Sequence, residues 1–192
     1  MSLVSQRGNE ILSRLGCNYG CMGAEVGVYD GRLSGYLLRE QLNLVLLMVD
    51  RWGVADDRYK ASGSQMAQKN HEEWEVVRAK ARANVAFAHN RAVMLQGEAM
   101  DVANMVQFHS LDFAFLDADH SYEAVAEDIE CWWPKIRRGG WLCGHDWDHP
   151  EAHLGHDNTV RTWGVKRAVL ERFGIEDIQI GDNRTWFIQK PI

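Results

Sequence analysis

Residues 111–147 read LDFAFLDADHSYEAVAEDIECWWPKIRRGGWLCGHDW, and this stretch decides the fold. It contains two apolar runs, residues 111–116 and residues 141–143, separated by a helical pattern and a glycine pair. Both runs stop at ionisable residues: Asp117, Asp119 and His120 after the first, His145 and Asp146 after the second. A strand–helix–strand unit of this kind places two buried parallel strands in one sheet. Because ligands of open α/β sheets bind beyond the carboxyl ends of the strands, we expect a ligand site here.

The same alternation continues on both sides of this stretch. Apolar runs predict strands at 24–29, 43–49 and 92–95. Apolar side chains at three- and four-residue spacing predict helices at 1–16, 33–38, 74–88 and 165–173, and a short helix follows Gly97–Glu98 and ends at Val106. The helix after residue 120 is expected to begin near Ser121 and to end at Arg138–Gly139–Gly140. Residues 175–180 and 185–190 flank Gly181–Asp182–Asn183–Arg184, which is a hairpin signal, whereas 51–63 and 147–160 are expected to be loops. The sequence therefore predicts a doubly wound, mostly parallel α/β sheet that ends in an antiparallel hairpin.

Length and composition narrow the class of protein. The chain has 192 residues, 46% of them hydrophobic and 25% charged, which fits one domain over 1–192 with a helical extension at 1–20. A formal charge of −6 disfavours a nucleic-acid or anionic-membrane surface. No apolar run approaches the roughly 20 residues of a membrane span, and no signal-peptide core is visible, so we expect a cytoplasmic protein. The four cysteines, Cys17, Cys21, Cys131 and Cys143, lack CxxC spacing and are expected to be free thiols in a reducing compartment.

A cofactor site is indicated by the ends of the first two strands. The first turn, residues 25–31, reads EVGVYDG. Its two glycines and Gly35 beyond it have GxxxGxxxG spacing rather than the GxGxxG that a dinucleotide fold uses. Glu25 and Asp30 would repel a pyrophosphate and suit a ligand that carries a positive charge and an amino group. Asp50 ends the second strand, where it could accept both hydroxyls of a ribose. Glycine turns and strand-end acids are also common as plain loop chemistry.

These residues carry a family resemblance. The run AEVGVYDGRLSGYLL at 24–38, Asp50 and FLDADHSY at 115–122 resemble a class I S-adenosylmethionine-dependent methyltransferase. The block DADHSYEAVAEDIECWWPKIRRGGWLCGHDW resembles, more narrowly, macrocin O-methyltransferase-like sugar methyltransferases and, more distantly, catechol O-methyltransferase. The resemblance implies a Rossmann-like sheet of seven strands with the last one antiparallel, and S-adenosylmethionine as cofactor. It also implies the residues that line the cofactor: Glu25, Gly27, Tyr29, Gly31, Ser34, Asp50, Gly97, Glu98, Ala99 and Asp117. Trp52 is expected either to stack on the adenine or to lie in the core.

The remaining strand-end residues are suited to activating a hydroxyl group. Methyl transfer to oxygen requires the loss of a proton, through a general base or a Lewis-acid metal. The resemblance assigns a divalent cation, Mg²⁺ or Mn²⁺, to Asp117, His145 and Asp146, although His145 stands where the family often has a carboxylate. It assigns the catalytic base to His120, with Asp117 beside it. Asp119 could bind a metal, orient His120 or cap the following helix.

We therefore expect an enzyme that methylates a hydroxyl of a small acceptor, such as a sugar, a sugar-bearing metabolite or a phenol. Nucleic acid and membranes are not expected partners, and a homodimer is compatible with the many tryptophans. Two alternatives stay open: an NAD- or nucleotide-dependent oxidoreductase, disfavoured by the missing GxGxxG, and a non-catalytic relative that binds a metabolite. The histidine-rich segment 147–160 is expected to be a lid or an acceptor-binding loop.

Overall fold

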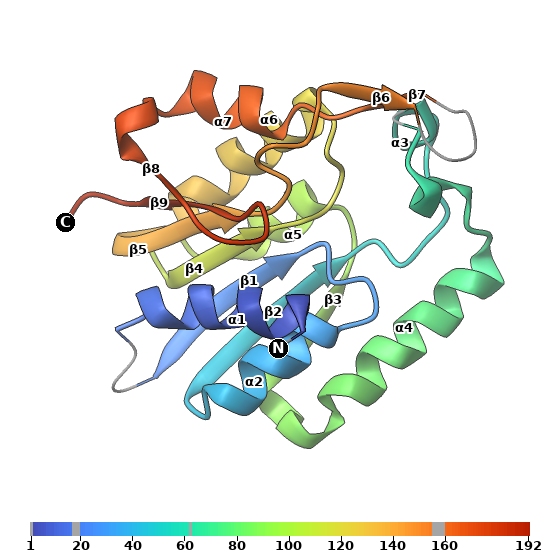
Figure 1. The fold of residues 1–192 in the computed structure, drawn as a ribbon. Coiled ribbons are helices and arrows are strands. Elements are labelled where there is room, and N and C mark those ends of the chain that lie inside the picture. Colours follow the sequence, from blue (N-terminus) through green and yellow to red (C-terminus); the bar gives the residue numbers. More distant parts are fainter. Residues whose placement is uncertain (1, 17–19, 62, 155–159) are drawn as a thin grey trace.

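The computed structural model describes residues 2–16, 20–61, 63–154 and 160–192. The chain forms a seven-stranded sheet in the order β3-β2-β1-β4-β5-β9-β8 (Figure 1). Strands β1 to β5 are parallel, and β9 is antiparallel to both β5 and β8. The predicted seven-stranded, mostly parallel sheet with an antiparallel hairpin is confirmed. The strands are β1 (Cys21–Val26), β2 (Leu44–Asp50), β3 (Ala92–Gln96), β4 (Leu111–Leu116), β5 (Ile136–Gly144), β8 (Ile178–Ile180) and β9 (Trp186–Gln189).

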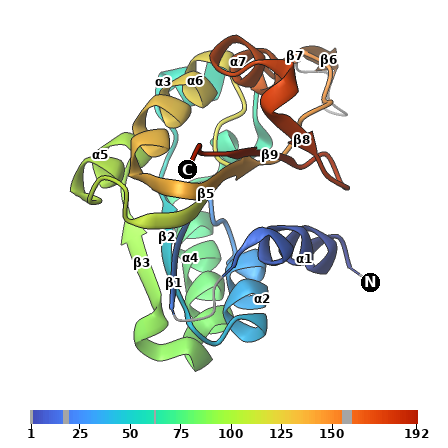
Figure 2. The same ribbon diagram turned by 90° about the vertical axis from the view of Figure 1, so that its left-hand side faces the viewer.

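Helices cover both faces of the sheet (Figure 2). One face packs against α1 (Leu3–Arg14), α2 (Arg32–Glu40) and α4 (His71–Val85), and the other against α5 (Ala99–Met105), α6 (Tyr122–Trp132) and α7 (Val165–Arg172). A short helix, α3 (Asp57–Ala61), and four 3-10 segments, η1 (Gln65–Gln68), η2 (Ala86–Arg91), η3 (Trp133–Lys135) and η4 (Ile175–Asp177), complete the helical elements described. No described helix is long and apolar enough to cross a membrane.

The apolar runs form strands because the sheet is buried on both faces. In β4, Phe113 and Phe115 pack towards α1, α2 and α4, whereas Ala114 and Leu116 pack towards α5, α6 and α7. A strand that loses water on both sides needs apolar residues at successive positions, as residues 113–116 provide. The helices instead need one apolar stripe each.

The glycine pair after α6 has a different role from the predicted one. The α-helix ends at Trp132 and not at Arg138–Gly139–Gly140, because Pro134 lacks the N–H that would continue the hydrogen-bond ladder. Gly139 and Gly140 lie inside β5, where the pairing of β4 with β5 shifts register. Gly139 has a φ of 71°, and a Cβ on Gly140 would lie 2.8 Å from the Asp112 carbonyl oxygen. The glycines therefore allow an irregularity in the sheet that larger residues would oppose.

Other predicted boundaries were also wrong. The first strand, expected at 24–29, spans Cys21–Val26. The expected loop at 51–63 contains α3, and the expected loop at 147–160 contains parts of a separate hairpin, β6 (Ala152–Leu154) with β7 (Val160–Thr162). The expected strand at 175–180 begins as η4, so only Ile178–Ile180 pairs with β9. These segments are short, and each is determined by its tertiary neighbours more than by local pattern. The predicted β8–β9 hairpin is confirmed. In its turn the Thr185 N–H donates to the Asp182 carbonyl oxygen, and the two central residues, Asn183 and Arg184, have positive φ of 51° and 59°.

The cysteine prediction is confirmed in part. Cys131 and Cys143 are free, and burial raises the pKa of the Cys143 thiol. Cys21, at the start of β1, is disulfide-bonded, which contradicts the expectation of a free thiol. Cys17 lies outside the described residues. Disulfide formation depends on the distance and direction of two Cβ atoms, which CxxC spacing alone does not test.

Candidate active site

A cavity of about 920 Å³ opens at the carboxyl ends of β1, β2, β3 and β4. Nine of the predicted site residues line it: Glu25, Gly27, Tyr29, Asp50, Gly97, Glu98, Ala99, Asp117 and His120. Gly31, Ser34, His145 and Asp146 do not line this cavity and contact residues around it. The volume suits a ligand of several rings and chains rather than a small ion.

Each of the two glycines of the β1–α2 turn lets the backbone lie close to a different neighbouring element. Gly27 has a φ of 91°, and a Cβ there would lie 2.2 Å from the Asp117 carbonyl oxygen. Gly27 therefore lets the turn lie against the end of β4 while it lines the cavity. Gly31 has a φ of 74° at the N-terminus of α2, and its Cβ would lie 2.9 Å from the Cα of Ala81 in α4. Gly31 therefore allows α2 and α4 to pack closely and does not line the cavity, and its contact with a cofactor stays a prediction.

Glu25 and Ser34 form a buried pair beneath the turn. Glu25 is 2% exposed and Ser34 is fully buried, and the Ser34 hydroxyl donates a hydrogen bond to Glu25. Burial raises the pKa of Glu25 to about 8. Without a ligand the carboxyl is therefore largely protonated at neutral pH. A positive group in the cavity would favour its ionised form, because opposite charges nearby lower the pKa of an acid.

Asp50 is held in place by backbone donors at the end of β2. Its Oδ2 accepts a hydrogen bond of 2.8 Å from the Tyr29 N–H, and its Oδ1 accepts one of 2.8 Å from the Trp52 N–H. Each oxygen keeps a second lone pair for a ligand hydroxyl. Trp52 is 2% exposed, and its indole N–H donates to the Tyr29 carbonyl oxygen, so this indole belongs to the core and not to the cavity.

Glu98, which follows β3, is already engaged by a cation. Its carboxylate receives two contacts from the Arg51 guanidinium, at 2.8 Å from Nε and 2.9 Å from Nη2. Such a two-point pair fixes the direction of the carboxylate. Glu98 therefore lines the cavity with its charge directed towards Arg51.

Beyond β4 and β5, two aspartates and two histidines meet. The Nε2 atom of His120 lies 3.2 Å from Asp117 Oδ1 and 3.2 Å from Asp146 Oδ2. The Nδ1 atom of His145 lies 3.2 Å from Asp146 Oδ1 and 3.7 Å from Asp117 Oδ1. The predicted strand-end residues are therefore brought together at one point, as the parallel strands require.

The protonation of this cluster follows from its charges. Burial opposes ionisation of Asp117, but the hydrogen bond from His120 and the nearby charges of His145, His120 and Arg7 hold its pKa below the usual range. The pKa of Asp146 is likewise lowered: burial opposes this, whereas the hydrogen bond from His145 and the charge of His120 favour it. Burial disfavours a charged His120, yet Asp117 and Asp146 raise its pKa above the usual value. Both carboxylates are ionised at neutral pH, and His120 readily holds a proton.

The donor set also fits a divalent cation. Among the described residues, Asp117, His120 and Asp146 each offer a ligand atom, and these atoms lie within 4.8 Å of one another. The single N–H that Nε2 of His120 can carry does not donate in line to two carboxylates at once, whereas one cation can contact all three ligand atoms. His120 completes this group in the place where the sequence suggested His145.

The hydrogen bond that Asp119 accepts favours one of its three predicted roles, that of capping the following helix. Its Oδ1 accepts a hydrogen bond of 2.9 Å from the backbone N–H of Ser121, the residue at the N-cap of α6. The Ser121 hydroxyl makes no capping bond of its own. Asp119 thus satisfies a free donor at the start of α6, and it also lines the cavity.

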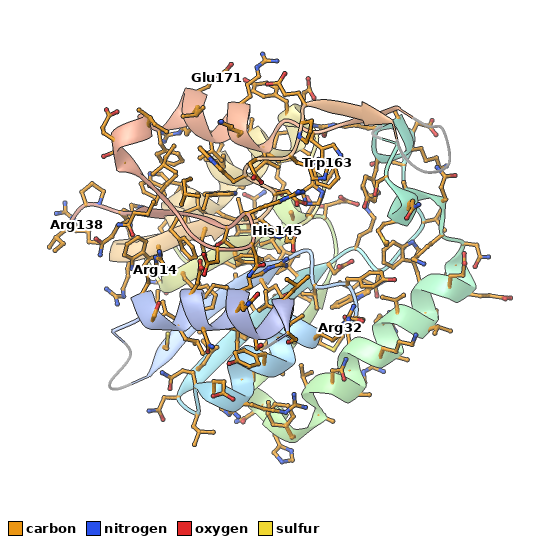
Figure 3. All side chains as sticks on the ribbon, viewed as in Figure 1. Arg14, Arg32, Arg138, His145, Trp163 and Glu171 are labelled. Atoms are coloured by element: carbon orange, nitrogen blue, oxygen red, sulfur yellow. The ribbon has the colours of Figure 1, made fainter. Side chains whose placement is uncertain are left out.

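Two residues of this site were not predicted. Arg7 of α1 donates from Nη1 to Asp117 Oδ2 at 2.8 Å, and its Nη2 lies 2.7 Å from His145 Nε2. Trp163 stacks between two imidazoles, with ring centroids 4.4 Å from His120 and 4.1 Å from His149. In Figure 3 the labelled His145 and Trp163 both lie at this end of the sheet. Arg7 could have been found as the charged member of the stripe that also contains Val4 and Ile11.

The structure describes only part of the histidine-rich segment 147–160. His149 stacks on Trp163 as described, whereas His156 and Asp157 lie outside the described residues. Trp163, just beyond this segment, thus stacks on His149 on one side and on His120 on the other.

Comparison with known proteins agrees with this geometry. Residues 24–147 match the family model described as a methyltransferase domain. A search of curated proteins finds no match. Solved structures share the fold at low identity, among them the O-methyltransferase NovP, at 19% identity and a TM-score of 0.63 over 98% of this chain and 78% of that one. CalS11, a TDP-rhamnose 3'-O-methyltransferase, matches at 14% identity and a TM-score of 0.63 over 96% and 78% of the two chains.

A third structure was solved with the product form of the cofactor. It is 1,6-didemethyltoxoflavin-N1-methyltransferase from Burkholderia thailandensis, with bound S-adenosylhomocysteine, at 11% identity and a TM-score of 0.57 over 99% and 79% of the chains. With more than half of its length matched by the family model, the chain belongs to the methyltransferase-domain family. It is a methyltransferase with the class I fold, the fold that it shares with these solved structures.

Proposed function

We propose that this methyltransferase uses S-adenosylmethionine as its cofactor and transfers the cofactor's methyl group to a hydroxyl of a small acceptor. The acceptor is a sugar, a sugar-bearing metabolite or a phenol. One observation carries the proposal: the imidazole of His120 lines the cavity and lies 3.2 Å from a carboxylate oxygen of both Asp117 and Asp146. An acid–base group held by carboxylates serves an acceptor that must lose a proton, and hydroxyl groups are such acceptors.

The cavity supports one orientation of the cofactor. Glu25, with its raised pKa, suits the ammonium group of the methionine part, and ionises when that charge arrives. Asp50, with both oxygens fixed by backbone N–H groups, suits the ribose hydroxyls. Residues 97–99 after β3 then border the adenine. This places the reactive methyl group towards Asp117 and His120.

The residues of the acceptor end perform three tasks. S-adenosylmethionine supplies a methyl group already activated on a sulfonium, so that a carbon–oxygen bond forms as the carbon–sulfur bond breaks. His120 in its neutral form takes the proton of the hydroxyl, and Asp117 orients the imidazole and stabilises the charge that forms on it. Trp163 lines the cavity and stacks on the His120 imidazole, so that it limits the directions in which this ring can turn. Holding the reacting atoms in line supplies much of the acceleration.

We also propose a site for a divalent cation, Mg²⁺ or Mn²⁺, in the same cluster. Asp117 and Asp146 would hold it, with His120 or His145 as the third ligand. It would lower the pKa of a bound hydroxyl as a Lewis acid. His120 cannot hold the cation and accept the proton through the same Nε2 atom. The sensitivity of the reaction to a chelator therefore distinguishes the two assignments.

The structural neighbours support an oxygen acceptor and a sugar in particular. NovP is described as an O-methyltransferase, and CalS11 acts on TDP-rhamnose. The macrocin O-methyltransferase-like resemblance of the 117–147 block points in the same direction.

Two measurements test the proposal. Isothermal titration should show micromolar binding of S-adenosylmethionine and S-adenosylhomocysteine, and the folded protein failing to bind either would refute the cofactor assignment. A panel of nucleotide sugars, glycosides and phenols, incubated with methyl-labelled cofactor with and without EDTA, should then yield an O-methylated product. Transfer only to nitrogen or carbon acceptors would overturn the hydroxyl assignment.

A further inference from the structure

Asp128 of α6 is a buried acid that the proposed mechanism does not use. The residue is 9% exposed and lines the cavity, together with Ala124 one turn earlier on the same helix. Among the described residues it has no hydrogen-bond or ion-pair partner. Burial raises its pKa to about 7, and the negative charges of Asp119 and Glu127 add to this effect. A carboxyl in this position costs stability unless a partner satisfies it.

The position of Asp128 indicates what kind of partner is missing. Its electrostatic neighbours include Glu98, which follows β3 at the end of the cavity where the proposed orientation places the adenine. Glu98 itself is engaged by the two contacts from Arg51. Met100 and Ala99 add apolar surface at the same end. An aromatic base could lie there with only its edge in need of polar partners.

We propose that Asp128 accepts a hydrogen bond from the exocyclic amine of the cofactor's adenine and thereby selects adenine over a 6-oxopurine. The proposal rests on the proposed function, because it uses the orientation of S-adenosylmethionine given above. An amine donates and a carboxylate accepts, so the pair is complementary, whereas the carbonyl oxygen of hypoxanthine would face the carboxylate as a second acceptor. Discrimination of this kind is strong because the wrong base leaves a buried polar group unpaired.

A bound water molecule is the competing explanation for the buried carboxyl of Asp128. A second cavity of about 10 Å³ also touches Asp128, on the side of Val125 and Val165. That is close to the smallest volume that holds one water molecule. Asp128 satisfied by such a water would have no part in base recognition.

The test compares two ligands on three proteins. S-adenosylhomocysteine and S-inosylhomocysteine, which differ at the amine, are titrated by calorimetry at pH 8.5 into wild type, Asp128→Ala and Asp128→Asn. The wild type should bind the adenine ligand roughly 10- to 100-fold more tightly than the inosine ligand, the range of one hydrogen bond to a charged group. Asp128→Ala should lose most of that preference through weaker binding of the adenine ligand. Asp128→Asn, whose amide can also donate, should favour the inosine ligand relative to wild type.

The controls keep the outcomes separate. Asp57→Asn changes a fully exposed aspartate of α3 in the same way and should leave both affinities unchanged. Melting temperatures of the unliganded variants report folding, and removal of an unpaired buried acid should not lower them. Wild type that binds both ligands within twofold, or Asp128→Ala that binds S-adenosylhomocysteine like wild type, overturns the inference and favours the water. Wild type that binds neither ligand contradicts the proposed function instead.

Discussion

In the proposed mechanism His120 is the base, and the residues around it orient the imidazole and stabilise its charge. Its Nε2 faces Asp117 and Asp146, and its ring stacks on Trp163. The carboxylates raise the pKa of the imidazole, and the indole limits the directions in which the ring can turn. A base that is oriented and charge-stabilised in this way lowers the barrier for removing a hydroxyl proton.

Replacement of His120 by alanine should therefore lower kcat by roughly 10²- to 10⁴-fold, the usual contribution of a general base. The affinity for S-adenosylhomocysteine should change by less than about threefold, because the imidazole acts on the acceptor side. Steady-state methyl-transfer assays and calorimetry measure the two quantities. His71→Ala, at the exposed start of α4, serves as the control. A His120→Ala enzyme with kcat within threefold of wild type would exclude His120 as the base.

At the scale of elements, α1 brings a permanent positive charge into the carboxylate cluster. Arg7 donates to Asp117 at 2.8 Å, both side chains are about four-fifths buried, and the guanidinium carbon lies 5.7 Å from the centre of the Phe115 ring. A divalent cation at Asp117 and Asp146 must bind against this charge. Two unit charges roughly 4 Å apart interact by about 4 kcal/mol at an effective dielectric constant near 20.

Arg7→Gln should consequently raise the affinity for Mn²⁺ at least about tenfold, since repulsion is removed while the ligand atoms remain. Titration of free Mn²⁺ by electron paramagnetic resonance measures this without an acceptor. Arg14→Gln removes a cation from the same helix that contacts the Phe187 ring and not Asp117, and should leave Mn²⁺ binding unchanged. Asp117→Asn should abolish the binding. Weaker Mn²⁺ binding by Arg7→Gln would mean that Arg7 supports the cation site.

The β1–α2 turn is a second element on which the site depends. A methyl group at position 27 would meet the Asp117 carbonyl oxygen at 2.2 Å, and the φ of 91° is strained for any residue with a Cβ. Gly27→Ala should lower the free energy of unfolding by roughly 2–4 kcal/mol and weaken cofactor binding as well. Urea denaturation gives the first value, and Gly16→Ala, whose Cβ meets nothing within 4 Å, is the matched control. Equal stability of the two variants would show that the turn can move away from β4 at no cost.

For the whole molecule, stability should depend on pH through the buried acid Glu25. Its pKa is about 8 in the folded chain, against an ordinary value of 4.5, so the folded state binds more protons than the unfolded state between these limits. Stability of the unliganded protein must then fall as pH rises from about 5 to 8. Asp128, whose pKa is about 7 against an ordinary value of 3.8, adds to the fall, and His120, with its raised pKa, adds to it above its ordinary pKa of 6.5.

Glu25→Gln should remove a large part of this fall in stability with pH and leave the part that Asp128 and His120 contribute. Urea unfolding at pH 5.5 and pH 8.0 should show wild type losing on the order of 2–4 kcal/mol and Glu25→Gln distinctly less. The exposed Glu72→Gln of α4 should behave like wild type. An identical loss in Glu25→Gln and wild type would show that Glu25 is ionised in the folded chain throughout this range.

The sequence by itself determined the sheet, its order of elements and the residues at its carboxyl edge. This was possible because burial on both faces requires unbroken apolar runs, and a parallel strand ends where a run meets an acid, as at Asp50 and Asp117. The β8–β9 turn was equally predictable, because its backbone angles favour Gly, Asn and Asp.

Only the tertiary structure decided which partner each residue at the edge of the sheet contacts. Gly31 looked like part of the cofactor turn and packs against Ala81, while Glu98 is engaged by Arg51. Arg7 and Asp128 are charged members of helical stripes, and the stripe predicts burial but not the partner. Partners depend on distances between atoms from elements far apart in the chain, and local pattern carries no information on such distances. The sequence therefore predicts which residues lie at the edge of the sheet, whereas the contacts among these residues are determined by the tertiary structure.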